Sequence, residues 1–247
     1  MNKFLLLVQF FTTIPVKKSL SFDQEEFHQS AWYMPLLGLF VGVLQLSFAW
    51  TLSQMFSREW TLSMLFLFSF FLTGGLHLDG LADTFDGLFS GRKREEMLEI
   101  MKDSRLGTHG VLSLGFLFLL KFQLLYWMPK DLFYPVVFLL PLLGRSILLG
   151  VCPKTPYARK EGFGQLFIGK VSLGTAWMAH GVTIFFLWWM LSYGGVVAYG
   201  LVMLCGVLLK RKVVTLLGGL TGDILGAFLE GGEVLFLFFY VLQKGGL

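Results

Sequence analysis

The sequence contains few of the residues that build covalent cross-links or soft metal sites. Its 247 residues include two cysteines and four histidines. Cys152 and Cys205 both lie in apolar surroundings, and neither forms part of a CxxC or Cys/His spacing. The sequence therefore argues against a disulfide framework and against a zinc site.

Charged residues are also scarce. They make up 15% of the chain, against 55% hydrophobic residues, and the mean hydropathy is +0.69. A soluble domain typically has about 25% charged residues, so we expect an integral membrane protein with the lipid bilayer as its partner. The net charge of +4 would suit a nucleic-acid partner in a soluble protein. Here the basic residues gather in loops between apolar runs, so we expect no nucleic acid.

The apolar runs predict an all-α, polytopic fold. A helix needs about 20 apolar residues to cross the hydrocarbon core. We expect about seven transmembrane helices in a single domain over residues 1–247. Stretches of small residues can pack helices within one subunit or between subunits, so a homo-oligomer is one possible assembly. The candidate spans are 32–54, 60–78, 111–128, 132–152, 173–192 and 195–209, followed by a glycine-broken region at 213–242.

The first residues, "MNKFLLLVQFFTTIPVKK", begin like a signal peptide. However, Pro15 and two lysines stand where a small-residue cleavage site would be expected. We therefore expect a retained N-terminal segment that is interfacial or re-entrant.

The basic residues also predict an orientation. The loops 92–105, 154–170 and 210–212 hold five, four and three Lys or Arg residues, whereas the opposite connections hold one or none. The positive-inside rule places the rich loops in the cytoplasm. The span that ends near Leu78 then returns to the cytoplasmic side, and the aspartates that follow it face the cytoplasm.

An acidic pattern follows this span. On a helix, Asp79, Asp83 and Asp86 stand at i, i+4 and i+7, so their carboxylates share one face. Converging carboxylates repel one another unless a cation neutralises them, and hard oxygen ligands favour Mg²⁺, Mn²⁺ or Ca²⁺. The alternative is that they only solvate a helix end. Asp223, between two glycine-rich stretches, is a candidate further ligand or, alternatively, a helix cap.

Basic residues close to the acidic pattern predict an anionic substrate. Metal-binding acids beside Arg and Lys suit a phosphoanhydride, whose oxygens must be neutralised during transfer. The alternative is anchoring to anionic lipid. Asp103 lies in the same segment, and His77 is interpreted equally as a ligand, an acid/base group or a hydrogen-bonding residue. The basic candidates are Arg92, Lys93, Arg94, Lys102, Arg105, Arg145 within a span, and Arg159 in a loop on the same side.

Seven segments along the chain form an ordered set: "QFFTTIPV", "YMPLLGLFVG", "GGLHLDGLADTFDGL", "EIMKDSRLGTHG", the "GR" of the fourth span, "YAR..GFG" and "GGLTGDILGA". Taken together, they resemble the cobalamin synthase family, the adenosylcobinamide-GDP ribazoletransferases. The resemblance covers nearly the whole chain in the same order. Two departures are Phe85, where a small residue is common, and "TT" in place of the "TR" usual before "IPV".

The resemblance implies a Mg²⁺-dependent enzyme of the bacterial inner membrane that performs the last assembly step of the cobamide nucleotide loop. It would join adenosylcobinamide-GDP to α-ribazole or its 5′-phosphate, giving adenosylcobalamin or its 5′-phosphate and GMP. In this hypothesis Asp79, Asp83, Asp86 and Asp223 hold the metal. Asp86 is the first choice of general base, with Asp83 and His77 as further catalytic candidates. The substrate-binding candidates are Arg92, Lys102, Asp103, Arg105, Arg145 and Arg159.

Two other functions remain open from the sequence. A phospholipid-synthesising CDP-alcohol phosphotransferase would show DxxDGxxAR followed by GxxxDxxxD, whereas the spacing here is DGxxDxxDG. A cation transporter would favour acids near the middle of the membrane and paired half-helices.

Overall fold

The computed structural model describes residues 2–16 and 24–244, and the regular elements of these residues are helices. Two short 3₁₀-helices lie at Ala31–Tyr33 and Phe163–Leu166. The α-helices are α1 (Asn2–Phe11), α2 (Gln24–Ser30), α3 (Met34–Ser53), α4 (Arg58–Thr73), α5 (Leu76–Leu88), α6 (Arg94–Ile100), α7 (Thr108–Tyr126), α8 (Lys130–Val151), α9 (Leu173–Leu217) and α10 (Gly222–Gln243).

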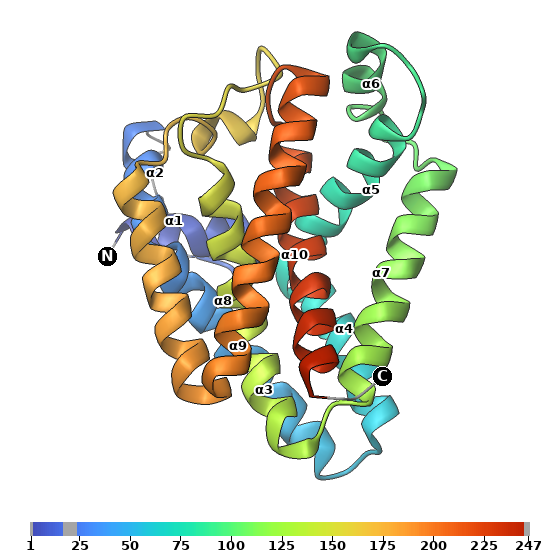
Figure 1. Ribbon diagram of the computed structural model, residues 1–247, viewed down its shortest axis with the longest axis vertical. Coiled ribbons are helices and arrows are strands. Elements are labelled where there is room, and N and C mark those ends of the chain that lie inside the picture. Colours follow the sequence, from blue (N-terminus) through green and yellow to red (C-terminus); the bar gives the residue numbers. More distant parts are fainter. Residues whose placement is uncertain (1, 17–23, 245–247) are drawn as a thin grey trace.

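The longest apolar helices pack around α8 (Figure 1). Helices α3, α9 and α10 cover it, and 78% of the residues in the most apolar stretch of α8 are buried inside the protein. Glycines permit this close packing: a Cβ on Gly38 of α3 would lie 2.6 Å from the Cα of Leu142 on α8. By length and composition, five of the described helices can cross a membrane, or six if α4 and α5 count as one bent span. This confirms the expected polytopic, all-α fold.

Helix α9 is a hairpin of two arms rather than one straight rod. Its backbone leaves the helical region at Ser192 (φ 57°, ψ −158°). The ring of His180 hydrogen-bonds the hydroxyl of Tyr199 at 2.7 Å. These residues would be about 28 Å apart along a continuous helix. The two arms therefore run side by side (Figure 1), as the separate predicted spans 173–192 and 195–209 require.

The predicted span over 60–78 is a bent pair of helices rather than one straight helix. Helix α4 ends at Thr73, and α5 departs from it at an angle of 92°. Gly74 and Gly75 both adopt left-handed conformations, with φ of 64° and 71°, which only glycine adopts readily. The bend separates the apolar helix from the helix that carries the aspartates.

The N-terminal helix α1 is too short to cross a bilayer. Ten residues span about 15 Å, half of the hydrocarbon thickness. Its residues Leu7 and Phe11 are buried in the core. After the helix, the backbone N–H of Thr13 donates to the carbonyl of Leu72 at 2.9 Å, which fixes this segment against the end of α4.

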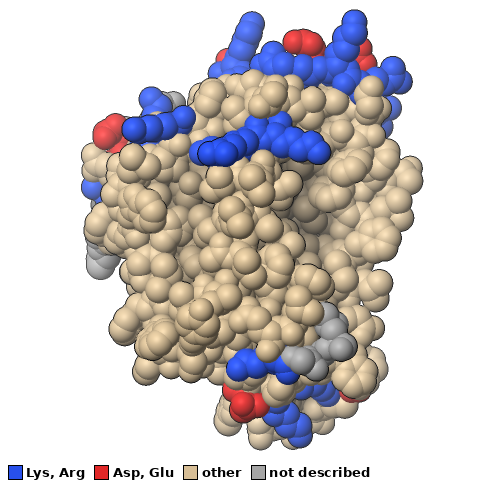
Figure 2. Space-filling model, viewed as in Figure 1, with Lys and Arg blue, Asp and Glu red and all other residues tan. Residues whose placement is uncertain are grey.

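The basic loops lie together at one end of the molecule. Figure 1 shows α6, the 152–172 loop and the junction of α9 with α10 at that end, and Figure 2 shows Lys and Arg gathered there. The glycine-broken region at 213–242 divides at Gly218. Residues 213–217 complete the second arm of α9, and α10 starts a new crossing at Gly222.

Candidate active site

The acidic pattern forms the predicted helical face on α5. Asp79, Asp83 and Asp86 all lie within this helix, which begins one turn before Asp79. Their exposure decreases along the helix: Asp79 is exposed, Asp83 is half-buried and Asp86 is 9% exposed. The three carboxylates therefore have different environments despite their shared face.

Two glycines bring α5 against the first turns of α10. A Cβ on Gly80 would lie 2.8 Å from the carbonyl oxygen of Asp223 and 2.9 Å from its Cα. One turn later on α10, a Cβ on Gly226 would lie 2.9 Å from the carbonyl oxygen of His77. Because both contacts are with backbone, these positions admit only hydrogen. This packing places Asp223 beside the aspartates of α5.

A backbone bridge brings Arg159 to the same place. Residues Tyr157 and Leu220 form a parallel bridge. Its hydrogen bonds run from the N–H of Ala158 to Leu220 and from the N–H of Leu220 to Pro156, at 2.9 and 3.0 Å. The bridge aligns the two loops so that Arg159 pairs with the Asp223 carboxylate at 2.5 Å.

The resulting cleft has a volume of about 230 Å³. One wall is polar, with Asp79, Asp223, Arg159 and the N-terminus of α10 at Gly222. The lining also includes an aromatic wall formed by Phe10, Phe11, Phe163 and Phe167. The cleft therefore combines acids and one arginine with a ring-binding surface.

The electrostatics of the cleft are dominated by carboxylates. Asp83 interacts unfavourably with Asp79 and Asp223 and favourably with Arg159. One arginine does not balance three carboxylates, and their oxygens are the ligands that Mg²⁺ prefers. The described residues do not, however, include three His, Cys, Asp or Glu side chains already gathered around one metal position. The donor chemistry fits a hard cation, with Asp223 held by Arg159 in this structure.

Asp86 caps another helix. Its two carboxylate oxygens accept hydrogen bonds from the backbone N–H groups of Gly107 and Gly110 at 2.7 and 2.8 Å. These N–H groups lie at the start of α7, where the helix provides no intrahelical acceptor for them. Asp86 therefore ties α7 to α5, and both of its oxygens are occupied. This argues against Asp86 as metal ligand or general base.

This cap predicts a stability effect for Asp86→Ala. The change leaves one buried and one partly buried N–H group without an acceptor, so we expect a loss of about 2 kcal/mol and a lower Tm in detergent. The milder Asp86→Asn keeps one oxygen acceptor. We expect its activity to need the same Mg²⁺ concentration for half-maximal rate as the wild type. A tenfold increase in that concentration would instead assign Asp86 to the metal.

The basic residues of the 92–105 segment lie at the surface, and four of the five have an acidic partner nearby in the chain. Arg92 is 3.8 Å from Glu96, and Lys102 donates to Glu99 at 2.8 Å. The guanidinium of Arg105 holds the pKa of Asp103 down to about 2, because it hydrogen-bonds that carboxylate with Nε and Nη2. None of these side chains lines the cleft in the described residues. Their substrate-binding role remains a prediction for which a bound substrate would have to recruit them.

Arg145 and His77 lie deeper than predicted. Arg145 is 2% exposed in the middle of α8, where it lines a second cavity rather than the cleft. His77 is 6% exposed and lines both spaces, with its ring 5.7 Å from that of Phe11. Arg145 therefore does not line the cleft, and its role in binding substrate stays a prediction.

Sequence reasoning missed two features of the cleft. The first is the aromatic wall, although "QFF" and "GFG" carry three of its rings. The second is Tyr157, whose hydroxyl donates to the carbonyl of Glu161 at 3.2 Å and whose ring lines the cleft. Burial raises the pKa of Tyr157, which keeps its hydroxyl protonated. Neither feature has a diagnostic spacing, because the segments meet only through the fold.

Comparison with known proteins gives a consistent result. The family model described as cobalamin-5-phosphate synthase matches residues 3–241. A relative from Alkaliphilus metalliredigens is 39% identical over 247 residues, covering 99% of this chain and 97% of the relative. One from Desulfitobacterium hafniense is 41% identical over 244 residues, covering 96% and 95%. Both are named adenosylcobinamide-GDP ribazoletransferase. No solved structure matches the chain at a significant level.

Proposed function

Since the chain belongs to the cobalamin-5-phosphate synthase family and is a transferase of that family, we propose that it joins adenosylcobinamide-GDP to α-ribazole or its 5′-phosphate. The products are adenosylcobalamin or its 5′-phosphate and GMP. The observation that carries the proposal is the cleft lined by Asp79, Asp223 and Arg159, with Asp83 within electrostatic reach of all three. Such a set of acids and one arginine suits a diphosphate accompanied by a cation.

The diphosphate would bind where the loop of Arg159 meets α10. Arg159 supplies a guanidinium, whose Nε is buried and without a hydrogen-bond partner in the described structure. The first N–H groups of α10 add a positive helix end. Gly164 packs closely against this helix start, because a Cβ on Gly164 would lie 2.6 Å from the backbone nitrogen of Gly222. The aromatic wall offers a surface for the rings of the substrate.

A Mg²⁺ ion would be held by Asp79, Asp83 and Asp223. When bound, it neutralises charge on the diphosphate oxygens. For Asp223 to serve, Arg159 must release it, and a diphosphate oxygen is the natural new partner for that arginine. Asp86 is left out of the ligand set because its oxygens accept the α7 N–H groups.

In the transfer, the ribazole 3′-hydroxyl oxygen bonds to the phosphorus nearer the corrinoid, and the bond from that phosphorus to the oxygen shared with GMP breaks. The proton of the hydroxyl needs a carboxylate within hydrogen-bond reach. We assign this to the carboxylate oxygen of Asp79 that does not hold the cation, since Asp79 is the most exposed of the three and lines the cleft. The proposed setting is the bacterial cytoplasmic membrane, with the basic end and the cleft facing the cytoplasm.

Dependence on Mg²⁺ is the direct test of this proposal. Purified protein in detergent is expected to release GMP from adenosylcobinamide-GDP with one of the two ribazole acceptors. Chelation with EDTA should reduce the rate to background, and added Mg²⁺ should restore it. Full turnover after chelation would contradict the metal proposal. The absence of GMP release with both acceptors, alongside cation flux in liposomes, would favour a transporter.

A further inference from the structure

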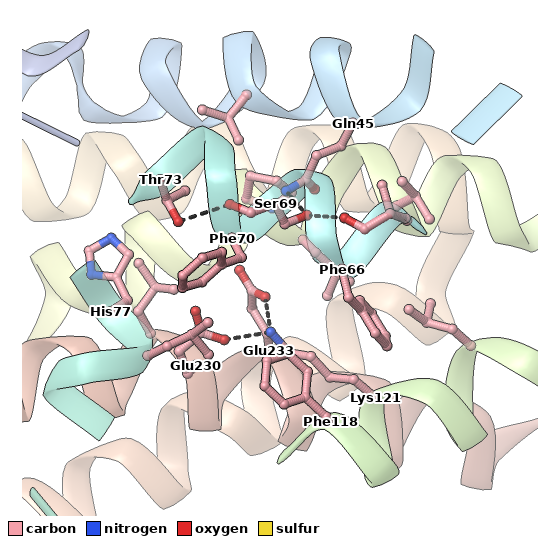
Figure 3. Close-up of a pocket in the computed structure, with 18 of the residues that line it drawn as sticks. Gln45, Phe66, Ser69, Phe70, Thr73, His77, Phe118, Lys121, Glu230 and Glu233 are labelled. Carbon is pink, nitrogen blue, oxygen red and sulfur yellow. Dashed lines mark hydrogen bonds and ion pairs between the residues drawn. The ribbon is translucent and has the colours of Figure 1, made fainter. Parts of the chain in front are cut away.

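A second polar cavity lies inside the helical bundle, and nothing in the proposed transfer uses it. Figure 3 shows Lys121 of α7 between Glu230 and Glu233 of α10, below the polar side chains of α3 and α4. The volume of this cavity is about 80 Å³. Polar groups in the interior of a membrane protein are costly and commonly functional.

The fixed charges of this cavity balance. The ammonium of Lys121 donates to Glu230 at 2.6 Å and to Glu233 at 2.7 Å. Arg145 adds a second positive charge, and its field acts favourably on Glu233. Two cations face two carboxylates, so a charged ligand would leave an uncompensated charge in a low-dielectric region. The cavity therefore favours a neutral group.

The cavity also contains donors that lack acceptors. Arg145 is 2% exposed, and its Nη1 donates to the carbonyl of Pro141 at 3.0 Å. Its Nε and Nη2 are buried and have no partner among the residues that the structure describes, and the same is true of Nε2 of His77. A buried unpaired donor costs about 1–3 kcal/mol. A ligand that brings a hydrogen-bond acceptor to Arg145 would remove this cost.

A primary carboxamide meets these requirements. Its carbonyl oxygen accepts from Arg145, and its NH₂ group donates to the carboxylates or to other acceptors of the wall. A single water also donates and accepts, and the cavity of about 80 Å³ holds several waters, since one water needs roughly 10–15 Å³ of such space. A carboxamide at the end of a side arm would replace some of these waters with a donor and an acceptor of its own.

The position of His77 connects the cavity to the proposed active site. His77 lines this cavity on one side and the cleft on the other. The helix turn that carries His77 and Asp79 is therefore shared by both spaces. Cobinamide carries primary carboxamide arms on its ring. A corrinoid whose diphosphate lies at Asp79 can thus extend an arm toward His77.

We propose that the cavity lined by Lys121, Arg145, Glu230 and Glu233 is a subsite for a primary carboxamide arm of the corrinoid, an inference that rests on the proposed function. The arm fixes the corrinoid in the membrane-embedded part of the enzyme and leaves the diphosphate at the surface of the bilayer. In this role Arg145 is a specificity-determining residue rather than a phosphate ligand.

Two variants with a matched control test the subsite. Ser69→Leu adds an apolar side chain where the Ser69 hydroxyl accepts from Gln45 at 3.0 Å, and it changes no charge. Arg145→Lys keeps the positive charge but replaces the planar set of guanidinium N–H donors with a single ammonium group. Ser63→Leu makes the same change as the first variant at an exposed position of α4. The probe is cobinamide without GDP, titrated in detergent by its absorbance, together with a form whose amides are hydrolysed to acids.

We expect the wild type and Ser63→Leu to bind cobinamide alike, and Ser69→Leu and Arg145→Lys to bind it roughly tenfold more weakly. The acid form should bind poorly to all of them. In the GMP assay, KM should rise in the two cavity variants with a smaller change in kcat. Equal cobinamide affinity in all four proteins would overturn the subsite and indicate a cavity that holds water only.

The GMP assay separates this inference from the function on which it rests. GMP release by the wild type, with unchanged cobinamide affinity in Ser69→Leu and Arg145→Lys, overturns the subsite alone. A wild type that releases no GMP with either acceptor overturns the proposed function. If Arg145→Lys fails to fold, the cobinamide affinity of Ser69→Leu still tests the subsite, because this variant leaves every charge in place.

Discussion

Asp83→Asn is expected to lower the rate of GMP release by roughly 100-fold or more at saturating Mg²⁺. Asp83 is half-buried on α5, within electrostatic reach of Asp79, Asp223 and Arg159. Replacement by the amide removes a charge without removing volume. It weakens the attraction for a cation while leaving the packing of α5 on α10 intact. The measurement is steady-state release of GMP over a Mg²⁺ titration.

The control for this variant is Asp131→Asn, the same chemical change in the first turn of α8, at the other end of the molecule. We expect it to retain wild-type turnover. Both proteins should show the same Tm as the wild type within a few degrees, which separates lost chemistry from lost folding. Wild-type turnover of Asp83→Asn would contradict the assignment of the metal site to α5.

Gly80→Ala is expected to have the second largest effect, although it adds one methyl group. The new Cβ would lie 2.8 Å from the carbonyl oxygen of Asp223 and 3.2 Å from its carbonyl carbon. Backbone atoms cannot rotate away, so α5 and α10 must separate. We expect a loss of about 1–3 kcal/mol in stability. Activity should fall further than stability, because the same shift moves Asp223 away from Asp79 and Asp83.

Gly231→Ala is the matched control on α10. A Cβ at Gly231 meets nothing within 4 Å, so the substitution should leave activity unchanged and raise stability by about 0.5–1 kcal/mol through the helix propensity of alanine. Tm in detergent and GMP release measure both quantities. If Gly80→Ala matched Gly231→Ala in both, the helix contact would not position the site.

The buried ion cluster shows the limit of reading charges from the chain. Glu230 and Glu233 lie within the apolar helix α10, where unpaired acids are costly. Their partner, Lys121, lies 109 and 112 residues earlier in the chain. Nothing in the local pattern of α7 distinguishes this lysine from one that reaches a membrane surface. Packing of α7 against α10 decides the pairing.

For the aspartates, too, the sequence predicts one property and the tertiary structure decides another. Their shared face followed from the sequence, because the geometry of a helix fixes the direction of residues three and four apart. The role of Asp86 did not follow, since its partners Gly107 and Gly110 belong to another helix. The ion pair of Arg159 with Asp223 depends likewise on a bridge between two distant loops.

The sequence by itself determined that this protein is a bundle of apolar helices with basic loops at one end, and it identified the family through ordered motifs. Both follow from local properties, namely hydropathy over about 20 residues and residue types at fixed spacing. The tertiary structure decided the bend at Gly74 and Gly75, the cap at Asp86 and the charge-balanced cavity. Each of these depends on contacts between segments far apart in the chain, which backbone packing and burial select.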